Sequence, residues 1–180
     1  AVPANIAKVA AGGITNLTTL NLGDALITDA VTANLLAKAT AASVNATGAS
    51  AAEVASLVTN IGNIAAGGIT GALPITNAVS DTNIGALFAK TNSTTALVNA
   101  TSMTPAQLAA IATTKVATGG ITNLTALALN DAAIGDTVTA GLLSKATAAT
   151  VVATGATAAE VAALVMNIGN IAAGGITGTG

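Results

Sequence analysis

The stretch Gly62–Thr70, GNIAAGGIT, recurs unchanged at Gly169–Thr177. Its Gly-Gly-Ile-Thr core also occurs at Gly12–Thr15 and Gly119–Thr122. The four glycine pairs begin at residues 12, 67, 119 and 174, so successive pairs lie 55, 52 and 55 residues apart. A period in this range over the whole chain indicates a tandem array rather than a globular domain.

A longer period contains the shorter one. When the chain is shifted by 107 residues, Lys8–Gly71 aligns with Lys115–Gly178, and 50 of these 64 positions are identical. The middle copy is a divergent relative, so the unit of duplication is a pair of unlike repeats. We therefore expect one continuous solenoid over residues 1–180, with a partial repeat at 1–11, full repeats at 12–66, 67–118 and 119–173, and a partial repeat at 174–180.

Each repeat is predicted to begin with a strand. Residues Ile14–Leu22 end in the alternating run Thr-Leu-Asn-Leu, which predicts a strand with Leu20 and Leu22 facing inward. Leu127 and Leu129 repeat these positions in the third copy. The middle copy carries Pro74, which cannot donate a backbone hydrogen bond, so its strand should be shorter or irregular.

A helix is predicted after this strand. Three segments share an aspartate, an apolar pair and a lysine nine residues after the aspartate: Asp29 to Lys38 (DAVTANLLAK), Asp81 to Lys90 (DTNIGALFAK) and Asp136 to Lys145 (DTVTAGLLSK). Aspartate accepts hydrogen bonds from the free amides of a first turn, and lysine is favoured in a last turn. The predicted inward pairs are Leu35-Leu36, Leu87-Phe88 and Leu142-Leu143.

A second strand and a second helix complete the repeat. The strands are predicted at Ser43–Gly48, Leu97–Ser102 and Thr150–Gly155, with Val44 and Ala46 inward. A capping box then opens each helix: Ser50 with Glu53, Thr104 with Gln107, and Thr157 with Glu160, with Pro105 suited to the first helical position. An apolar stripe follows at Val54, Leu57, Val58, Ile61 and Ile64. The double glycine is predicted to end this helix.

The predicted fold class is therefore α/β: a solenoid of tandem strand-helix-strand-helix repeats of about 52–55 residues with short parallel strands. Hydrophobic residues make up 52% of the chain, but there is one Phe and no Trp or Tyr, which predicts a narrow, close-packed core. Only 7% of residues are charged and the net charge is -2, which argues against nucleic acid as a partner. Glycine, asparagine and proline interrupt every apolar stretch, so no membrane span is expected.

The residue types offer little chemistry. The chain has no His and no Cys, so we predict no catalytic, cofactor-binding or metal-binding residue and no enzyme activity. The acids Asp29, Asp81, Asp136, Glu53 and Glu160 are interpreted as helix caps. The alternative is calcium bound by Asp24 with Asp29, or by Asp131 with Asp136. The glycine pairs lack the lysine of a phosphate loop.

Two surface features leave alternatives open. Glycosylation sequons occur at Asn16, Asn45, Asn92, Asn99 and Asn123. The outward side chains Asn45 and Thr47, Asn99 and Thr101, and Thr154 are expected to form a flat polar ladder that could bind carbohydrate or ice. A solvated strand face is the simpler interpretation.

The repeats also resemble a known class of proteins. The runs ITDAVTANLLAK, VSDTNIGALFAK and IGDTVTAGLLSK, followed by VNATGASAAEVASL or VVATGATAAEVAAL, resemble the Ala/Thr-rich tandem repeats of giant secreted bacterial surface proteins, near type I secreted adhesins. The resemblance implies an extracellular, non-enzymatic, structural or adhesive role. The glycine-aspartate nonapeptide of calcium-binding β-rolls is absent. A local likeness joins ITNLTTLNL to bacterial leucine-rich repeats.

These observations predict an extracellular or cell-surface structural protein of a bacterium or archaeon that stacks head to tail with itself into a filament, rod or surface layer. The alternative is a stalk or adhesin module that binds a cell-surface glycan or another surface. The N-terminus, AVPANIAKVAAGG, is not expected to be a signal peptide. Neither end carries a polar cap, which suggests an excised, processed or polymer-forming segment.

Overall fold

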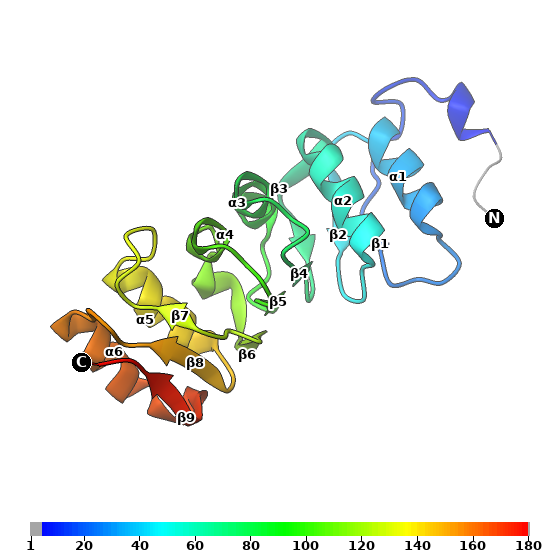
Figure 1. The fold of residues 1–180 in the computed structure, drawn as a ribbon. Coiled ribbons are helices and arrows are strands. Elements are labelled where there is room, and N and C mark those ends of the chain that lie inside the picture. The colour runs from blue at the N-terminus through cyan, green and yellow to red at the C-terminus, as the bar shows by residue number, and fades with distance from the viewer. Residues whose placement is uncertain (1–4, 180) are drawn as a thin grey trace. The chain divides into compact units, whose positions relative to one another are not determined.

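The structure is a computed structural model that describes residues 5–179, and these form an α/β protein with six helices and three small parallel sheets (Figure 1). The helices are α1 (Asp29–Lys38), α2 (Ala51–Thr59), α3 (Asp81–Lys90), α4 (Pro105–Ala109), α5 (Asp136–Lys145) and α6 (Ala158–Met166). The strands are β1 (Leu20–Asn21), β2 (Ala42–Asn45), β3 (Ile64–Thr70), β4 (Pro74–Ile75), β5 (Ala96–Asn99), β6 (Val116–Thr122), β7 (Leu127–Ala128), β8 (Ala149–Val152) and β9 (Ile171–Thr177). Four 3-10 helices complete this part of the chain: η1 (Ile6–Lys8), η2 (Ile61–Asn63), η3 (Thr113–Lys115) and η4 (Ile168–Asn170).

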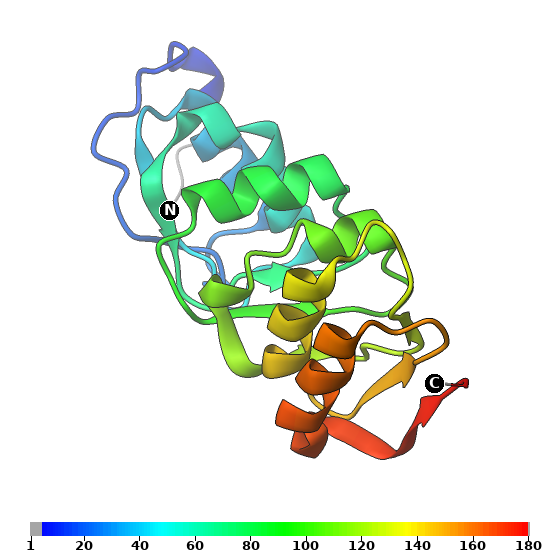
Figure 2. The ribbon, with the colours of Figure 1, turned by 90° about the vertical axis from the view of Figure 1, so that its left-hand side faces the viewer.

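The chain divides into two compact units. The first unit runs up to Pro74 and includes Gly85–Thr94, and it contains the sheet β1-β2-β3. The second unit comprises Ile75–Ile84 and the chain from Thr95 onward, and it contains β5, β6 and the sheet β7-β8-β9. Within the first unit α1 packs against α2, and within the second α5 packs against α6, as Figures 1 and 2 show.

The first helix of each repeat has the predicted bounds. α1, α3 and α5 each begin at the aspartate and end at the lysine. Their apolar pairs lie in the core: Leu36, Leu87, Leu142 and Leu143 are fully buried and Phe88 nearly so, whereas Leu35 is half-buried. At the end of α3, the Lys90 Nζ donates a hydrogen bond of 2.8 Å to the carbonyl oxygen of Ile64 in β3.

The capping boxes are also confirmed. The hydroxyls of Ser50, Thr104 and Thr157 accept from the backbone N–H three residues on, and the Glu or Gln there accepts in return from the cap backbone. Pro105 occupies the first turn of α4 as predicted. The apolar stripe, however, leaves the helix early, because α2 ends at Thr59 while Ile61 lies in η2 and Ile64 in β3.

The predicted role of the glycine pair was wrong. Gly67 and Gly68 do not end a helix; they lie inside β3, a strand that the sequence analysis missed. The pairs that begin at Gly119 and Gly174 lie likewise in β6 and β9, whereas Gly12 and Gly13 lie in a turn just before the Ile14 bridge. β3 pairs with β2 through Ala42–Ile64 and Val44–Ile69. Two steps along β2 thus match five steps along β3, so the glycines form a bulge that absorbs the extra residues.

Each glycine of the pair meets a different constraint. The first has a left-handed backbone, with φ of 71° at Gly12, 66° at Gly67, 70° at Gly119 and 69° at Gly174. The second has no room for a side chain: a Cβ on Gly68 would lie 2.8 Å from the carbonyl oxygens of Ala42 and Ala65. Both positions therefore require glycine, which explains why the pair is kept in every repeat of this chain.

The strands before the first helices are shorter than predicted. β1 and β7 contain two residues each, although Leu20, Leu22, Leu127 and Leu129 are buried as expected. Asn16 and Thr19 adopt positive φ angles of 56° and 59°, which interrupt the extended backbone. Ile14 still forms an isolated parallel bridge with Ala39. The second strands match their predictions within a few residues, and Val44 and Ala46 are fully buried.

Gly68→Ala tests the glycine constraint. We expect a loss of roughly 1–3 kcal/mol in the free energy of unfolding of the first unit, because the new methyl group meets two backbone oxygens that cannot move independently of the sheet. Urea denaturation followed by circular dichroism measures this loss. Gly62→Ala is the matched control, since a Cβ there meets nothing within 4 Å, and it should change stability by less than about 1 kcal/mol. Equal effects of the two substitutions would contradict the assignment.

Candidate functional site

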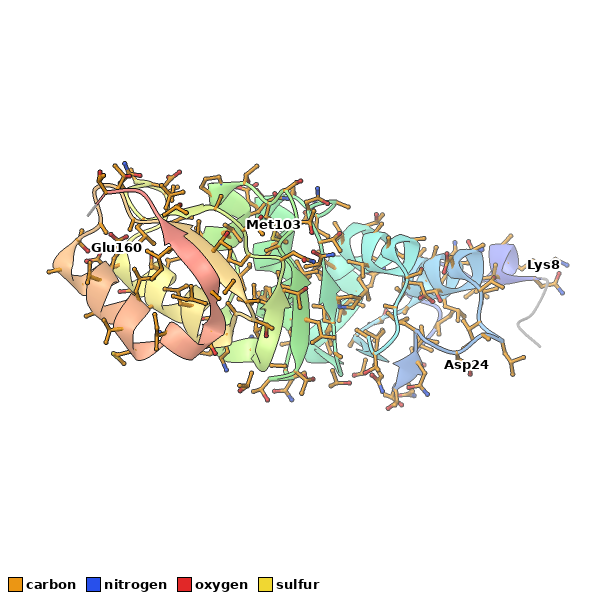
Figure 3. All side chains as sticks on the ribbon, turned by 60° about the horizontal axis from the view of Figure 1, so that its bottom comes forward. Lys8, Asp24, Met103 and Glu160 are labelled. Atoms are coloured by element: carbon orange, nitrogen blue, oxygen red, sulfur yellow. The ribbon has the colours of Figure 1, made fainter. Side chains whose placement is uncertain are left out.

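The two glutamates of the chain are buried at the start of the second helices. Glu53 is 3% exposed, and its Oε2 accepts from the Ser50 backbone N–H at 2.9 Å while its Oε1 accepts from the Thr32 hydroxyl at 3.2 Å. Glu160 is 1% exposed and has the same partners in its own repeat, Thr157 N–H at 2.8 Å and the Thr139 hydroxyl at 3.4 Å. Each carboxylate thus ties α1 to α2, or α5 to α6, from inside the unit. Figure 3 labels Glu160 on α6.

Asp29 and Asp136 do not cap the helices that they begin, which corrects the prediction for these two aspartates. Thr28 and Gly135 hold the cap positions of α1 and α5 without a side-chain cap bond, and the aspartate is the first helical residue. Asp29 Oδ1 instead accepts from the Ser50 hydroxyl at 2.8 Å, and Asp136 Oδ1 accepts from the Thr157 hydroxyl at 2.9 Å. The aspartate therefore joins the network that links the paired helices, while still placing negative charge at the helix start.

The middle repeat satisfies the same position with different chemistry. Ile84, which has no hydroxyl, stands where the other copies have threonine, and Gln107 replaces the glutamate. The Gln107 amide nitrogen donates to the backbone oxygens of Asn77 at 3.0 Å and Val79 at 2.7 Å. An acceptor-only carboxylate needs a donor such as threonine, whereas an amide supplies its own donor. The residue at the threonine or isoleucine position and the residue at the glutamate or glutamine position therefore depend on each other.

The acids proposed for calcium are engaged in local turns. Asp24, labelled in Figure 3 on the loop before α1, accepts from the Leu26 N–H at 2.9 Å through Oδ1, and Asp131 Oδ1 accepts from the Ala133 N–H at 2.9 Å. Over residues 5–179 no three acidic side chains come together in a group that could hold a metal ion. The structure thus explains Asp24 and Asp131 as turn residues.

The polar ladder bonds largely to itself. Thr47, Thr101 and Thr154 are exposed, as predicted. Asn99 Oδ1, however, accepts from the Thr101 hydroxyl at 2.7 Å and from the Asn123 amide at 2.9 Å, and the Thr47 hydroxyl accepts from the Ala72 N–H at 3.0 Å. Asn99 and Thr47 therefore hold local backbone turns and neighbouring segments through these bonds. Of the sequon asparagines, Asn16, Asn92, Asn99 and Asn123 are exposed and Asn45 is half-buried.

A set of exposed apolar side chains lies on α6, η4 and β9. It comprises Val161 (48% exposed), Val165 (68%), Met166 (83%), Ile168 (59%) and Ile176 (44%). One duplication earlier the counterparts of Val161 and Ile176 are buried, since Val54 is 3% exposed and Ile69 is fully buried. Val58 and Ile61 are half-buried there, and Thr59, the counterpart of Met166, is exposed. A groove of about 320 Å³ runs along this face, between Ile168 of η4 and Gly174 and Ile176 of β9. We call these residues the α6/β9 face.

Ile69 of β3 is covered because strand segments lie on both of its sides, whereas Ile176 of β9 has one on a single side. Ile69 in β3 pairs with Val44 on one side and forms a bridge to Thr91 on the other, where its carbonyl oxygen accepts from the Asn92 N–H at 2.8 Å. Ile176 pairs with Val151, but within the described residues no second strand or bridge lies on its other side. Figure 2 shows β9, in red, at the border of its sheet. Among the described residues β9 is thus an edge strand with exposed apolar side chains beside it.

None of the helices in the described part of the chain has the length and hydropathy that crossing a membrane requires. No protein-family model, curated protein or solved structure matches this chain.

Thr32→Val tests the buried carboxylate network. Removing the hydroxyl leaves the Glu53 Oε1 without this donor in the core, and we expect a loss of roughly 1–3 kcal/mol in the free energy of unfolding. Thr59→Val is the matched control because the Thr59 hydroxyl is exposed and bonds only to Ala55 in its own helix. Combining Thr32→Val with Glu53→Gln should be less than additive. A Thr32→Val protein as stable as the control would show that the bond contributes nothing.

Calcium should leave the protein unchanged. Because Asp24 and Asp131 serve turns and Asp29 and Asp136 bind hydroxyls, we expect the same Tm in excess calcium and in a chelator. Differential scanning calorimetry measures the comparison. A Tm that falls with chelator, and no longer does so in Asp24→Ala, would instead establish the calcium site.

Proposed function

We propose that this chain is an extracellular, non-enzymatic structural repeat protein that stacks with copies of itself into a filament, rod or surface layer. The supporting observation is a backbone pattern that each unit repeats. The isoleucine after each glycine pair forms a parallel bridge to the residue that follows the next helix: Ile14 to Ala39, Ile69 to Thr91, and Ile121 to Ala146. Ile176 follows the fourth glycine pair and occupies the corresponding position in β9.

This pattern supports an α/β solenoid. The bridged residues are 39 − 14 = 25, 91 − 69 = 22 and 146 − 121 = 25 positions apart, so one coil is a strand segment and a helix of this length. In solenoids each coil contacts mainly its neighbours, so copies that stack end to end continue the same pattern of contacts. A contact between unlike ends of identical chains does not close, so it produces a fibre.

The polar residues support a structural role. Six acidic side chains bind hydroxyls or backbone amides in the helix network or in turns: Asp24, Asp29, Glu53, Asp131, Asp136 and Glu160. A low content of charge, with exposed threonine and asparagine, suits a surface outside the cell and supports secretion or display on a cell surface. The composition and the resemblance to secreted bacterial repeat proteins favour a bacterial or archaeal source.

One observation supports a second function, that of a stalk or adhesin module. Thr47, Thr101 and Thr154 are exposed at corresponding places in three successive copies, which would suit a stalk or adhesin module that presents a regular surface to glycans. Many of the neighbouring polar atoms already bond to one another, so we rank this function second.

Negative-stain electron microscopy of the purified chain over a concentration series tests the proposal. We expect uniform filaments or rods whose length grows with concentration. X-ray diffraction from aligned samples should show a reflection near 4.8 Å, the spacing of hydrogen-bonded strands, along the long axis. Short particles of constant length at every concentration would contradict self-assembly and favour the stalk or adhesin, to be followed by glycan-array binding.

A further inference from the structure

The lysines and aspartates of this chain are sorted by sign. Each of the five lysines lies shortly before a strand or an isolated bridge, and each of the five aspartates lies after a strand, in the loop before a helix or at its first residue. The two glutamates are buried in the helix network. The lysines are Lys8, Lys38, Lys90, Lys115 and Lys145, and the aspartates are Asp24, Asp29, Asp81, Asp131 and Asp136.

Parallel strand pairing turns this order along the chain into two edges in each unit. β1, β2 and β3 are parallel in the first unit, and in the second β5 is parallel to β6 and β7 to β8 and β9. We call the edge at which the strands begin the basic edge; it carries Lys8, Lys38 and Lys90 in the first unit and Lys115 and Lys145 in the second. The acidic edge, at which the strands end, carries Asp24 and Asp29 in the first unit and Asp81, Asp131 and Asp136 in the second.

Hydrogen bonds fix the helix starts at the acidic edge. In the first unit the Ser50 hydroxyl donates to Asp29 Oδ1 at 2.8 Å, so α1 and α2 begin side by side. In the second unit the Gln107 amide, at the start of α4, donates at 2.7 Å to the carbonyl oxygen of Val79, two residues before Asp81. Four of the aspartates are exposed and one is half-buried. The carboxylates of both units are thus presented at the edge where the helices begin.

The lysines are placed equally well at the basic edge. The Lys90 Nζ donates at 2.8 Å to the carbonyl oxygen of Ile64, the first residue of β3. The carbonyl oxygen of Lys38 accepts from the Ile14 N–H at 3.0 Å, and Lys115 comes directly before β6. One lysine is exposed and four are half-buried, as expected when the aliphatic stem packs on the protein and the ammonium group reaches water.

The helix dipole explains only part of this sorting. Asp29 and Lys38 lie at the two ends of α1, where their charges are favoured. Asp24 and Asp131 lie in loops, however, and Lys115 lies in a 3-10 helix of three residues. These three charges gain little from a helix macrodipole, which acts within the first and last turns of a helix. The two edges therefore differ in charge as whole surfaces.

We propose that copies of this chain associate side by side and in the same direction, with the acidic edge of one copy against the basic edge of the next. Filaments would then join laterally into a layer. The proposal rests on the self-assembly proposed above and adds the second direction of growth, with the surfaces that meet.

The repeat identifies a second copy as the partner. The aspartates that begin the first helices stand at positions 29, 81 and 136, and the lysines that end them at 38, 90 and 145, so both series are spaced by 52 and 55 residues. A neighbour in the same direction thus presents lysines with the spacing of the aspartates that they face. A neighbour turned by half a turn about its long axis would place like charges together, which is unfavourable.

The association should depend strongly on salt. One exposed ion pair changes an association constant by only about twofold to fivefold, but successive repeats of one array act together. We expect layers or bundles at about 0.01 M salt, where the Debye length is about 30 Å, and separate filaments at about 1 M, where it is about 3 Å. Negative-stain electron microscopy and sedimentation velocity of the full chain measure this change.

Removing charge from the basic edge tests the surface itself. Lys38→Gln/Lys145→Gln should weaken lateral association at low salt by about fivefold or more. Ala55→Glu/Gly85→Glu is the matched control: it lowers the net charge by the same amount, on exposed positions in the middle of α2 and α3, and a Cβ at Gly85 meets nothing within 4 Å. The control should associate as the original chain does. Circular dichroism verifies that each variant is folded.

A mixing experiment identifies which edges meet. Lys38→Glu/Lys145→Glu weakens the basic edge, and Asp24→Lys/Asp131→Lys weakens the acidic edge. Each variant alone should form separate filaments at low salt, because each has one edge with little net charge. A mixture should form pairs of filaments, since the intact acidic edge of the first variant faces the intact basic edge of the second.

The outcomes separate this inference from the function it rests on. Filaments that stay separate at low salt, layers that persist at about 1 M salt, a control as impaired as the lysine variant, or a mixture without pairs would each overturn the edge-to-edge contact and leave self-assembly standing. Salt-dependent lateral pairs without filaments would overturn the filament and support the contact. Absence of filaments and of salt-dependent association would overturn both.

Discussion

The structure depends on a glycine pair in which each residue meets a different backbone constraint. The first glycine adopts a left-handed backbone, and the second passes so close to carbonyl oxygens of its own and the neighbouring strand that no methyl group fits. Together they let seven residues of β3 follow the shorter β2 while the isoleucine returns to register with Val44. The buried isoleucine, and the bridge it makes to the next coil, follow from this bulge.

The helices are held over the sheet by a second constraint, the need to satisfy buried polar atoms. The first and third copies use glutamate with threonine, and the middle copy uses glutamine with isoleucine and two backbone oxygens. Leaving one buried acceptor or donor unpaired costs more than the bond contributes, so neither residue can change alone. The divergence of the middle copy at these positions is therefore a coupled change between two equivalent solutions.

The sequence predicted the helices better than the strands, for physical reasons. Aspartate, lysine and the capping boxes act within one helical turn, so local pattern located α1, α3 and α5 to the residue. Glycine pairs are ambiguous, because a left-handed residue can end a helix or form a bulge, and only pairing with β2 decides between them. The bond from Ser50 to Asp29 likewise joins residues 21 positions apart and has no signal in local sequence.

The exposed surface of α6 and β9 was also not predictable from local sequence. The lack of His and Cys could be read from composition, but the exposure of the α6/β9 face could not, because Val161 and Val54 are the same residue in the same motif and differ only in what covers them. In a repeat protein, exposure is set by the neighbouring coil rather than by the sequence of the coil itself. A surface that is core in one copy and exposed in another is already shaped for the segment that covers it elsewhere.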